Sequence, residues 1–275
     1  MSATIVKPGV ATTERSRVES QPITVRRATA SEWIKFKTLR STWAVLGVAV
    51  LGMVVIGLIV AYNTRHLSSH LQANDLAPSG TLQGYYLGQL LIGALGVLFV
   101  SGEYSTGMIR STLAAVPKRV PVLWAKLAVF VAVTFTSMIV ICFVTFLSAQ
   151  GLLSHYRAGW SLSEPGVLRV VIGTAIYLTL IGVIGGVLGW IVRSTPGALV
   201  AYIGLTLVLP ALFGNVLGHF GENVGKFFPS SAGARFAASL PEGYSLTPGW
   251  GLAVLVGWVV VGLAVAAFLL RRRDA

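Results

Sequence analysis

The chain has 275 residues, of which 55% are hydrophobic and 11% are charged, and its mean hydropathy is +0.78. Soluble domains carry about 25% charged residues, so this composition excludes an ordinary soluble enzyme, a disordered chain and a nucleic-acid-binding module. The formal net charge of +12 indicates a membrane protein with basic loops, and the single cysteine, Cys142, excludes a disulfide framework.

Six apolar stretches are long enough to cross a bilayer, because a transmembrane helix needs about 20 residues at a rise of about 1.5 Å each. They cover residues 44–62, 82–101, 121–148, 167–191, 197–213 and 250–270. The sequence therefore predicts an all-α integral membrane protein with six transmembrane helices.

The lysines and arginines are distributed unevenly about these stretches. With the N-terminus inside, 16 of the 21 fall on the inner side and five on the outer side. The positive-inside rule then predicts that both termini lie in the cytoplasm. We expect a flexible cytoplasmic tail over residues 1–28 and a single six-span domain over residues 29–275.

A cytoplasmic helix is predicted over residues 29–42, before the first span. Thr29 and Glu32 have the spacing of a capping box at a helix start. Aromatic and basic side chains along this segment favour a helix that lies in the membrane interface. The residues assigned to that role are Trp33, Phe36, Lys37 and Arg40. The alternative is a cytoplasmic extension of the first span.

The connection after the second span is longer than a simple turn between helices requires. Residues 103–117 carry a mildly amphipathic stripe, and Pro117 ends the pattern. This predicts a helix presented to a cytoplasmic partner. The alternative is a solvated loop anchored by Lys118 and Arg119.

Catalytic and ion-coupling motifs are missing from the sequence. His66 and His70 form H-L-S-S-H, which lacks the glutamate of a zinc protease, and no phosphate-binding loop has the required spacing. All nine acidic residues lie outside the predicted span interiors, which weakens the case for a proton- or sodium-coupled carrier. We therefore expect no enzyme activity, metal or nucleotide in this chain.

Polar and small residues occur within the spans. Gln89, Thr136 and Thr145 are uncharged polar residues that either line a pathway or bond across helices. Gly182 and Gly186 have the four-residue spacing that lets helices pack closely, within the chain or between subunits. The segment 214–249, interrupted by prolines, is predicted to form external short helices or a plain loop.

Two strings resemble the actinobacterial branch of the ABC-2 type permeases, the membrane subunits of ABC exporters. They are Ser-Glu-Trp-Ile-Lys-Phe-Lys-Thr-Leu-Arg-Ser-Thr-Trp at 31–43 and Glu-Tyr-Ser-Thr-Gly-Met-Ile-Arg-Ser-Thr-Leu-Ala-Ala-Val-Pro-Lys-Arg at 103–119. The resemblance implies a connecting helix before the first span, a coupling helix at 103–117 that meets a separate ATP-binding subunit, and external helices between the fifth and sixth spans.

The resemblance also implies partners and contact residues. The candidates for contact with the ATP-binding subunit are Glu103, Tyr104, Met108 and Arg110. ATP and magnesium would bind in that subunit, and a second permease chain, as a homodimer rather than a heterodimer, would complete the pathway in a bacterial plasma membrane. The cargo would be a drug-like, lipid or peptide molecule. The alternatives are a secondary carrier or channel, or a non-transporting membrane partner of an ATPase.

Overall fold

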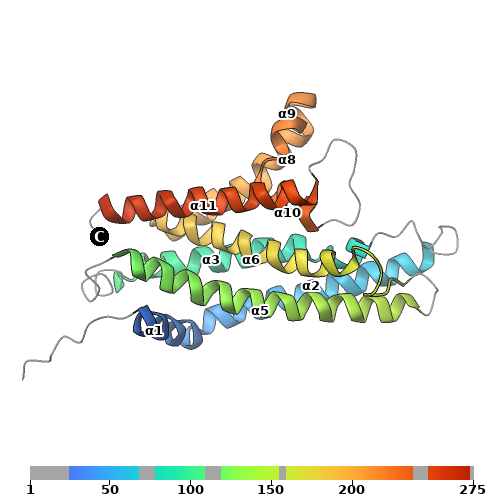
Figure 1. Cartoon of the computed structure of the whole chain (residues 1–275), viewed down its shortest axis with the longest axis horizontal. Coiled ribbons are helices and arrows are strands. Elements are labelled where there is room, and N and C mark those ends of the chain that lie inside the picture. The colour runs from blue at the N-terminus through green and yellow to red at the C-terminus, as the bar shows by residue number, and fades with distance from the viewer. Residues whose placement is uncertain (1–24, 68–77, 109–118, 155–158, 238–246, 273–275) are drawn as a thin grey trace, which may run out of the picture.

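The computed structural model describes residues 25–67, 78–108, 119–154, 159–237 and 247–272, and the regular structure in these ranges is entirely helical (Figure 1). The helices are α1 (Val25–Thr38), α2 (Arg40–Leu67), η2 (Pro78–Leu82), α3 (Tyr85–Ser105), α5 (Arg119–Ser154), α6 (Val167–Val192), α7 (Thr195–Ile203), η3 (Gly204–Val208), α8 (Leu209–Val216), α9 (Gly218–Gly225), α10 (Pro229–Ala237) and α11 (Pro248–Arg272). The predicted all-α fold is confirmed over the described residues.

Six helices in the described part are long and apolar enough to cross a membrane. They span Arg40–Thr64, Tyr85–Ser105, Pro121–Ser154, Val167–Val192, Thr195–Gly214 and Pro248–Arg272. Each overlaps one of the six predicted stretches, so the predicted number is confirmed. Hydropathy succeeds here because a helix in lipid needs an uninterrupted apolar stretch of fixed length.

The fifth of these helices is composite. It consists of α7, a π-helical turn at η3 and α8, with Pro210 in the first turn of α8. Because proline has no N–H to donate to the preceding turn, the helix widens to a π-turn immediately before it. The sequence predicts a single short span over 197–213 here, ending near Pro210, and does not predict the π-turn.

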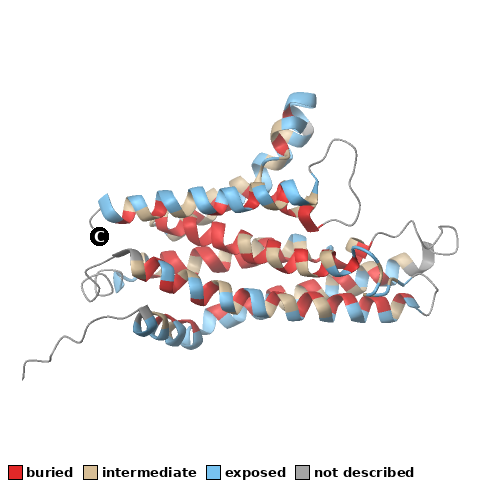
Figure 2. Cartoon of the chain, viewed as in Figure 1, coloured by how far each residue is buried: buried red, intermediate tan, exposed pale blue. Residues whose placement is uncertain are grey.

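Helix α6 forms the centre of the bundle and is mostly buried (Figure 2). It packs against α3, α5, α7, α10 and α11. Its contact with α3 is a close backbone approach: a Cβ at Gly185 would overlap the carbonyl oxygen of Gly93, and a Cβ at Gly96 would overlap that of Gly182. The glycine pattern of α6 therefore serves packing within the chain.

The N-terminal helix differs from its prediction. Helix α1 begins at Val25, so Thr29 lies inside it and the predicted capping box is wrong. The helix ends at Thr38 and α2 starts at Arg40, with the Trp43 indole N–H donating to the Lys37 carbonyl at 3.1 Å across the break. The predicted helix over 29–42 is thus split between two elements.

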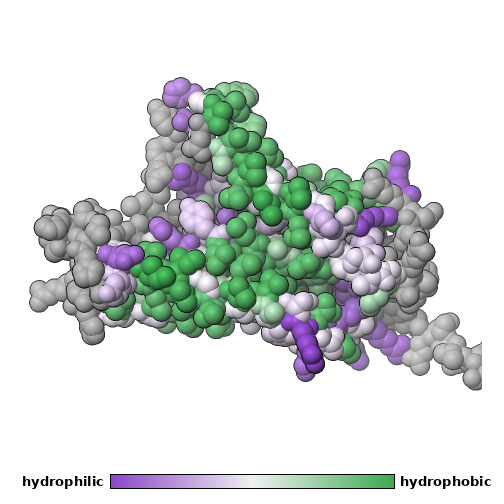
Figure 3. Space-filling model, turned by 180° about the vertical axis from the view of Figure 1, so that it is seen from behind, coloured by the Kyte–Doolittle hydropathy of each residue, from purple (hydrophilic) through white to green (hydrophobic). Residues whose placement is uncertain are grey.

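The described surface is largely apolar. Seen from behind, hydrophobic residues cover the middle of the bundle and continue onto the projecting α8 and α9 (Figure 3). Hydrophilic residues lie mainly towards the ends of the bundle and the tip of this projection. Helix α10 instead packs back against α6 and α11. Such an apolar middle is typical of a multi-pass membrane protein.

Candidate functional site: a buried charge cluster

Four charged side chains meet at the end of the bundle where α1 lies, and α1 is labelled at the left of Figure 1; they form the charge cluster. They are Glu32 and Lys35 of α1, Glu103 in the last turn of α3, and Lys126 in the second turn of α5. Glu32 and Lys126 are each only 2% exposed and Glu103 is 7% exposed. Because an isolated buried charge is very costly, each of these groups requires a partner of opposite charge.

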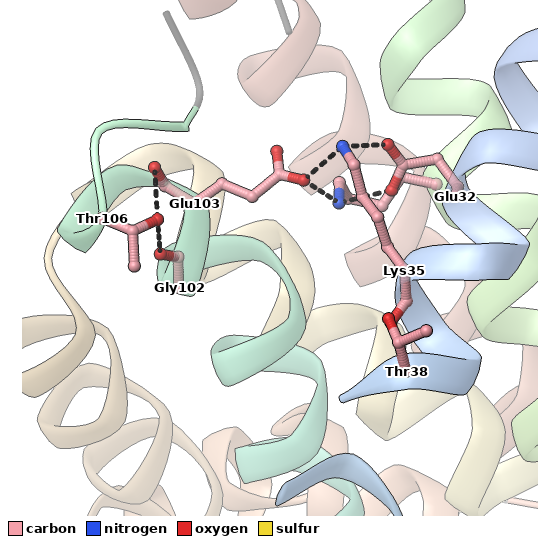
Figure 4. Close-up of polar contacts among 7 residues, drawn as sticks. Glu32, Lys35, Thr38, Gly102, Glu103 and Thr106 are labelled. Atoms are coloured by element: carbon pink, nitrogen blue, oxygen red, sulfur yellow. Dashed lines mark hydrogen bonds and ion pairs between the residues drawn. The ribbon is translucent and has the colours of Figure 1, made fainter. Parts of the chain in front are cut away.

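Each lysine of the charge cluster bridges both glutamates. Lys35 Nζ lies 2.9 Å from Glu32 Oε1 and 2.9 Å from Glu103 Oε1, contacts that Figure 4 shows converging between α1 and α3. Lys126 Nζ lies 2.6 Å from Glu32 Oε2 and 2.9 Å from Glu103 Oε1. Two positive and two negative charges alternate, so the cluster is neutral overall and ties three helices together.

Aromatic rings form the apolar side of the charge cluster. Lys126 Nζ lies 4.4 Å from the centroid of the Phe99 ring, a cation–π geometry. Phe99 contacts Phe36 edge to face at 5.2 Å and stacks on Phe130 at 5.9 Å. These rings exclude water from one side of the cluster and so strengthen its electrostatic interactions.

One carboxylate oxygen of the charge cluster is not used within it. Glu103 Oε1 accepts from both lysines, whereas Glu103 Oε2 is buried and has no hydrogen-bond partner among the described residues. The neighbouring Tyr104 hydroxyl is in the same situation, and Arg193 lies over the Tyr104 ring at 5.5 Å. Since buried polar atoms are normally hydrogen-bonded, this position suits an additional donor.

Lys35 is the most accessible member of the charge cluster, with 26% of its side chain exposed. Burial opposes the positive charge of Lys35, but the hydrogen bonds from its ammonium to Glu103 and Glu32 outweigh this effect and raise the pKa of Lys35 above its ordinary value. Lys35 is therefore fully charged at neutral pH and the ring of alternating charges is complete.

The predicted coupling residues lie in different places. Glu103 and Tyr104 belong to the last turn of the α3 span, so the predicted start of the coupling helix at about 103 falls inside α3, and most of that predicted helix lies outside the described residues. The α3 helix ends at Ser105, and the Thr106 hydroxyl donates to the Gly102 carbonyl at 2.9 Å (Figure 4). Gly107 follows with a φ of +70°, in the left-handed region. Met108 is exposed. Arg110 and the remainder of 109–117 lie outside the described residues.

The predicted interfacial residues do not share one face of a helix. Phe36 is 1% exposed and packs inward beside the charge cluster. Trp33, Lys37 and Arg40 are exposed, on the outer surface of α1 and at the start of α2. The spacing of apolar residues alone predicts that Phe36 faces lipid, but its contact with Phe99 turns it inward.

The predicted pathway residues are not brought together. Gln89 is buried. Its side-chain oxygen accepts a hydrogen bond from the Tyr177 hydroxyl, and its main-chain carbonyl oxygen accepts one from the Tyr202 hydroxyl at 2.6 Å. Thr145 is buried and Thr136 is exposed. No hydrogen bond joins any two of Gln89, Thr136 and Thr145 in the described part of the chain.

Sequence reasoning identifies only Glu103 among the four members of the charge cluster. It assigns Glu32 to helix capping and Lys35 to contact with lipid headgroups, and it counts Lys126 only as a charge on the inner side. The signal was present for Lys126, because it lies inside the apolar stretch 121–148 and an ionisable group within a span predicts a buried partner.

No protein-family model matches this chain, and no curated protein is significantly similar to it. The function is therefore inferred from the charge cluster, the arrangement of the helices and the sequence features described above.

Proposed function

We propose that this chain is the membrane-spanning permease subunit of an ABC exporter and that the charge cluster connects it mechanically to a separate ATP-binding subunit. The observation that carries this proposal is the buried, neutral cluster that fastens α1 to α3 and α5, at the end of the bundle where α3 leaves for its connection to α5. The strings at 31–43 and 103–119 support it, because they contain Glu32, Lys35 and Glu103.

The charge cluster suits transmission of force. Separating its members would leave buried charges uncompensated, at a cost of about 3–5 kcal/mol for a broken buried pair. A displacement of the segment after α3 therefore moves α1, α3 and α5 as one body. The close contact of α3 with α6 then passes this displacement to the centre of the bundle.

The distribution of the basic residues supports a cytoplasmic position for the charge cluster. The positive-inside rule assigns both termini, and with them the α3–α5 connection, to the side with 16 of the 21 basic residues. There the ATP-binding subunit, which would hold ATP and magnesium, meets Met108 and Arg110. An arginine or lysine of that subunit would supply the donor that Glu103 Oε2 accommodates.

Two spans have the surface expected for contact with lipid and with a second permease chain. In the most apolar part of the spans Thr195–Gly214 and Pro248–Arg272, only 17% of the residues are buried, against 72% in Val167–Val192. Their exposed apolar residues include Val200, Leu207, Val261 and Phe268. In the proposed exporter, a homodimer in a bacterial plasma membrane, part of this surface meets the second copy, and the cargo is a drug-like, lipid or peptide molecule.

The first experiment is purification of the tagged chain from its native membrane in mild detergent, followed by identification of co-purifying proteins and reconstitution. We expect a stoichiometric ATPase and ATP-dependent transport. A chain that purifies alone and moves solute under an ion gradient would overturn the proposal in favour of a secondary carrier, and an ATPase partner without any transport would indicate a non-transporting assembly.

The variant Glu103→Gln tests the role of the charge cluster in the reconstituted complex. It keeps the shape of the side chain but removes the charge that Lys35 and Lys126 share, so we expect transport per ATP hydrolysed to fall about tenfold, since charge-assisted hydrogen bonds contribute about 1.5–3 kcal/mol. Glu222→Gln removes an equal but exposed charge on α9 and serves as the control. Unchanged transport by Glu103→Gln would refute the assignment.

A further inference from the structure

The side of α1 that points away from the bundle carries basic and apolar side chains together. Positions 26, 33, 34 and 37 lie on one side of this helix, because an α-helix completes a turn in about 3.6 residues. The exposed residues at these positions, which form the outward face of α1, are Arg26, Trp33, Ile34 and Lys37. Glu32 lies on the opposite side and is buried. The charge cluster therefore leaves the outward face unused.

The charge at the outward face is entirely positive. Glu32 is the only acidic residue in α1 and α2, and both of its carboxylate oxygens are paired with lysines of the charge cluster. Arg40, the first residue of α2, is exposed and adds to the positive charge. Within the described part of the chain, the side chains of Arg26, Lys37 and Arg40 have no hydrogen-bond or ion-pair partner. This surface is therefore complementary to an anionic one.

Apolar side chains lie between the basic ones. Trp33 is 49% exposed and Ile34 is 61% exposed. Tryptophan beside lysine and arginine is typical of a helix in the membrane interface, where apolar side chains enter the acyl region and basic ones reach the phosphates. A soluble anion would contact only the charges, so the combination fits a phospholipid.

Helix α1 lies beside the beginning of a membrane-spanning helix, on the outside of the bundle (Figure 1). Glu32 Oε2 is 2.6 Å from Lys126 Nζ, and Lys126 is five positions after Pro121, where the α5 span begins. Five positions correspond to about 8 Å along the helix axis. Glu103 of the same cluster is two positions before Ser105, where the α3 span ends. The outward face of α1 is therefore at the boundary of the apolar region, where lipid headgroups lie.

The corner between α1 and α2 holds the basic groups in place. The Trp43 indole N–H donates to the Lys37 carbonyl oxygen at 3.1 Å, across the break at Leu39. The Trp43 ring also packs edge to face against the buried Phe36 ring, with the centroids 6.1 Å apart. Lys37 and Arg40 thus lie close to each other at a fixed corner, and a preformed surface loses less free energy on ordering when a ligand binds.

We propose that the outward face of α1, together with Arg40, binds anionic phospholipid of the leaflet at the charge-cluster end of the bundle. Lys37 and Arg40 hold the phosphate, and Trp33 and Ile34 lie against the acyl chains. The site does not depend on the proposed exporter function, because binding is measured on the full chain without an ATPase.

The test is native mass spectrometry of the delipidated chain in detergent, titrated separately with phosphatidylglycerol and with phosphatidylcholine of the same acyl chains. We expect tighter binding of phosphatidylglycerol. Lys37→Gln/Arg40→Gln should weaken it about thirtyfold, about fivefold for each basic group removed from an anionic surface, and should leave phosphatidylcholine unaffected. Trp33→Ala should weaken both lipids, because it removes an apolar contact that both make.

The matched control is Arg271→Gln/Arg272→Gln. It removes two exposed charges from the C-terminal end of α11, at the same end of the bundle but on the other side from α1 (Figure 1), and should leave binding of phosphatidylglycerol unchanged. Equal weakening by the two double variants would show attraction to overall charge and overturn the proposal. Equal binding of the two lipids, unaffected by Trp33→Ala, would also overturn it and would leave the outward face to a protein partner.

Discussion

At the scale of single residues, Lys126 and Lys35 make the same contacts in different surroundings. Lys126→Met would leave Glu32 and Glu103 sharing one lysine in a site that is nearly closed to water, at a cost of about 3 kcal/mol in the free energy of unfolding. Lys35→Met should cost about 1 kcal/mol or less, because the Lys35 side chain is partly exposed and Lys126 still pairs with both acids. Thermal unfolding of the two variants in detergent measures the difference, and equal effects would contradict the burial of the cluster.

The charge of Lys35 also predicts a pH dependence. The pKa of Lys35 is raised on folding, so its contribution to stability is fully present below its unfolded value, near 10.5, and is lost as the pH rises through the higher folded value. We expect the stability difference between wild type and Lys35→Met to be constant from about pH 7 to 9.5 and to shrink above 10.5. Thermal unfolding across this range checks it, and a difference that grows with pH would show that the sign is wrong.

A member of the charge cluster can be predicted from the sequence only where its neighbours in the chain already make it unusual. Glu103 was identifiable because a carboxylate at the boundary of an apolar stretch is unusual in itself. Glu32 was not, because its neighbours in sequence offer a local role in helix capping and only the packing of α1 against α3 and α5 turns it inward. Tertiary packing, which the spacing of residues does not encode, decided between the two.

At the scale of elements, glycines of α3 and α6 bring the backbones of these two helices into direct contact. Gly185→Ala would place a methyl group against the carbonyl oxygen of Gly93 and force the helices apart, with an expected loss of about 1–3 kcal/mol. Gly257→Ala on α11 is the matched control, since nothing lies within 4 Å of the added Cβ. Thermal unfolding in detergent should show a lower midpoint for Gly185→Ala only, and a comparable loss in both variants would indicate an effect on the helices themselves.

The elements themselves were predictable where one energy term dominates. The six spans follow from hydropathy because the backbone in lipid must satisfy its own hydrogen bonds over a fixed thickness. The break at Leu39 and the π-turn at Gly204–Val208 were not predicted, since neither interrupts the apolar or amphipathic pattern. Only Pro210 signals the π-turn, and a proline in a span fixes neither the size nor the position of the distortion.

At the scale of the whole molecule, the described chain carries two polar sites at opposite ends of one apolar bundle. The charge cluster joins α1, α3 and α5, whereas a cavity of about 400 Å³ at the other end is lined by residues of η2, α3, α6 and α10, so only α3 belongs to both. A displacement of α3 would therefore reach both ends of the bundle. The proposed exporter requires such a connection between its two ends, and it would place the cavity on the side of the membrane away from the ATPase.

The orientation of these two ends is the last prediction, and single cysteines test it. Met108 lies beyond the charge-cluster end of α3 and Thr247 precedes α11 at the opposite end, and both are exposed, whereas the native Cys142 is buried and should not react. Because 16 of the 21 basic residues fall on the side of Met108, the positive-inside rule predicts that a membrane-impermeant maleimide labels Thr247→Cys in intact cells and Met108→Cys only after lysis. The reverse pattern would place the charge cluster outside, where no ATP-binding subunit could reach it, and would leave the cavity facing the cytoplasm.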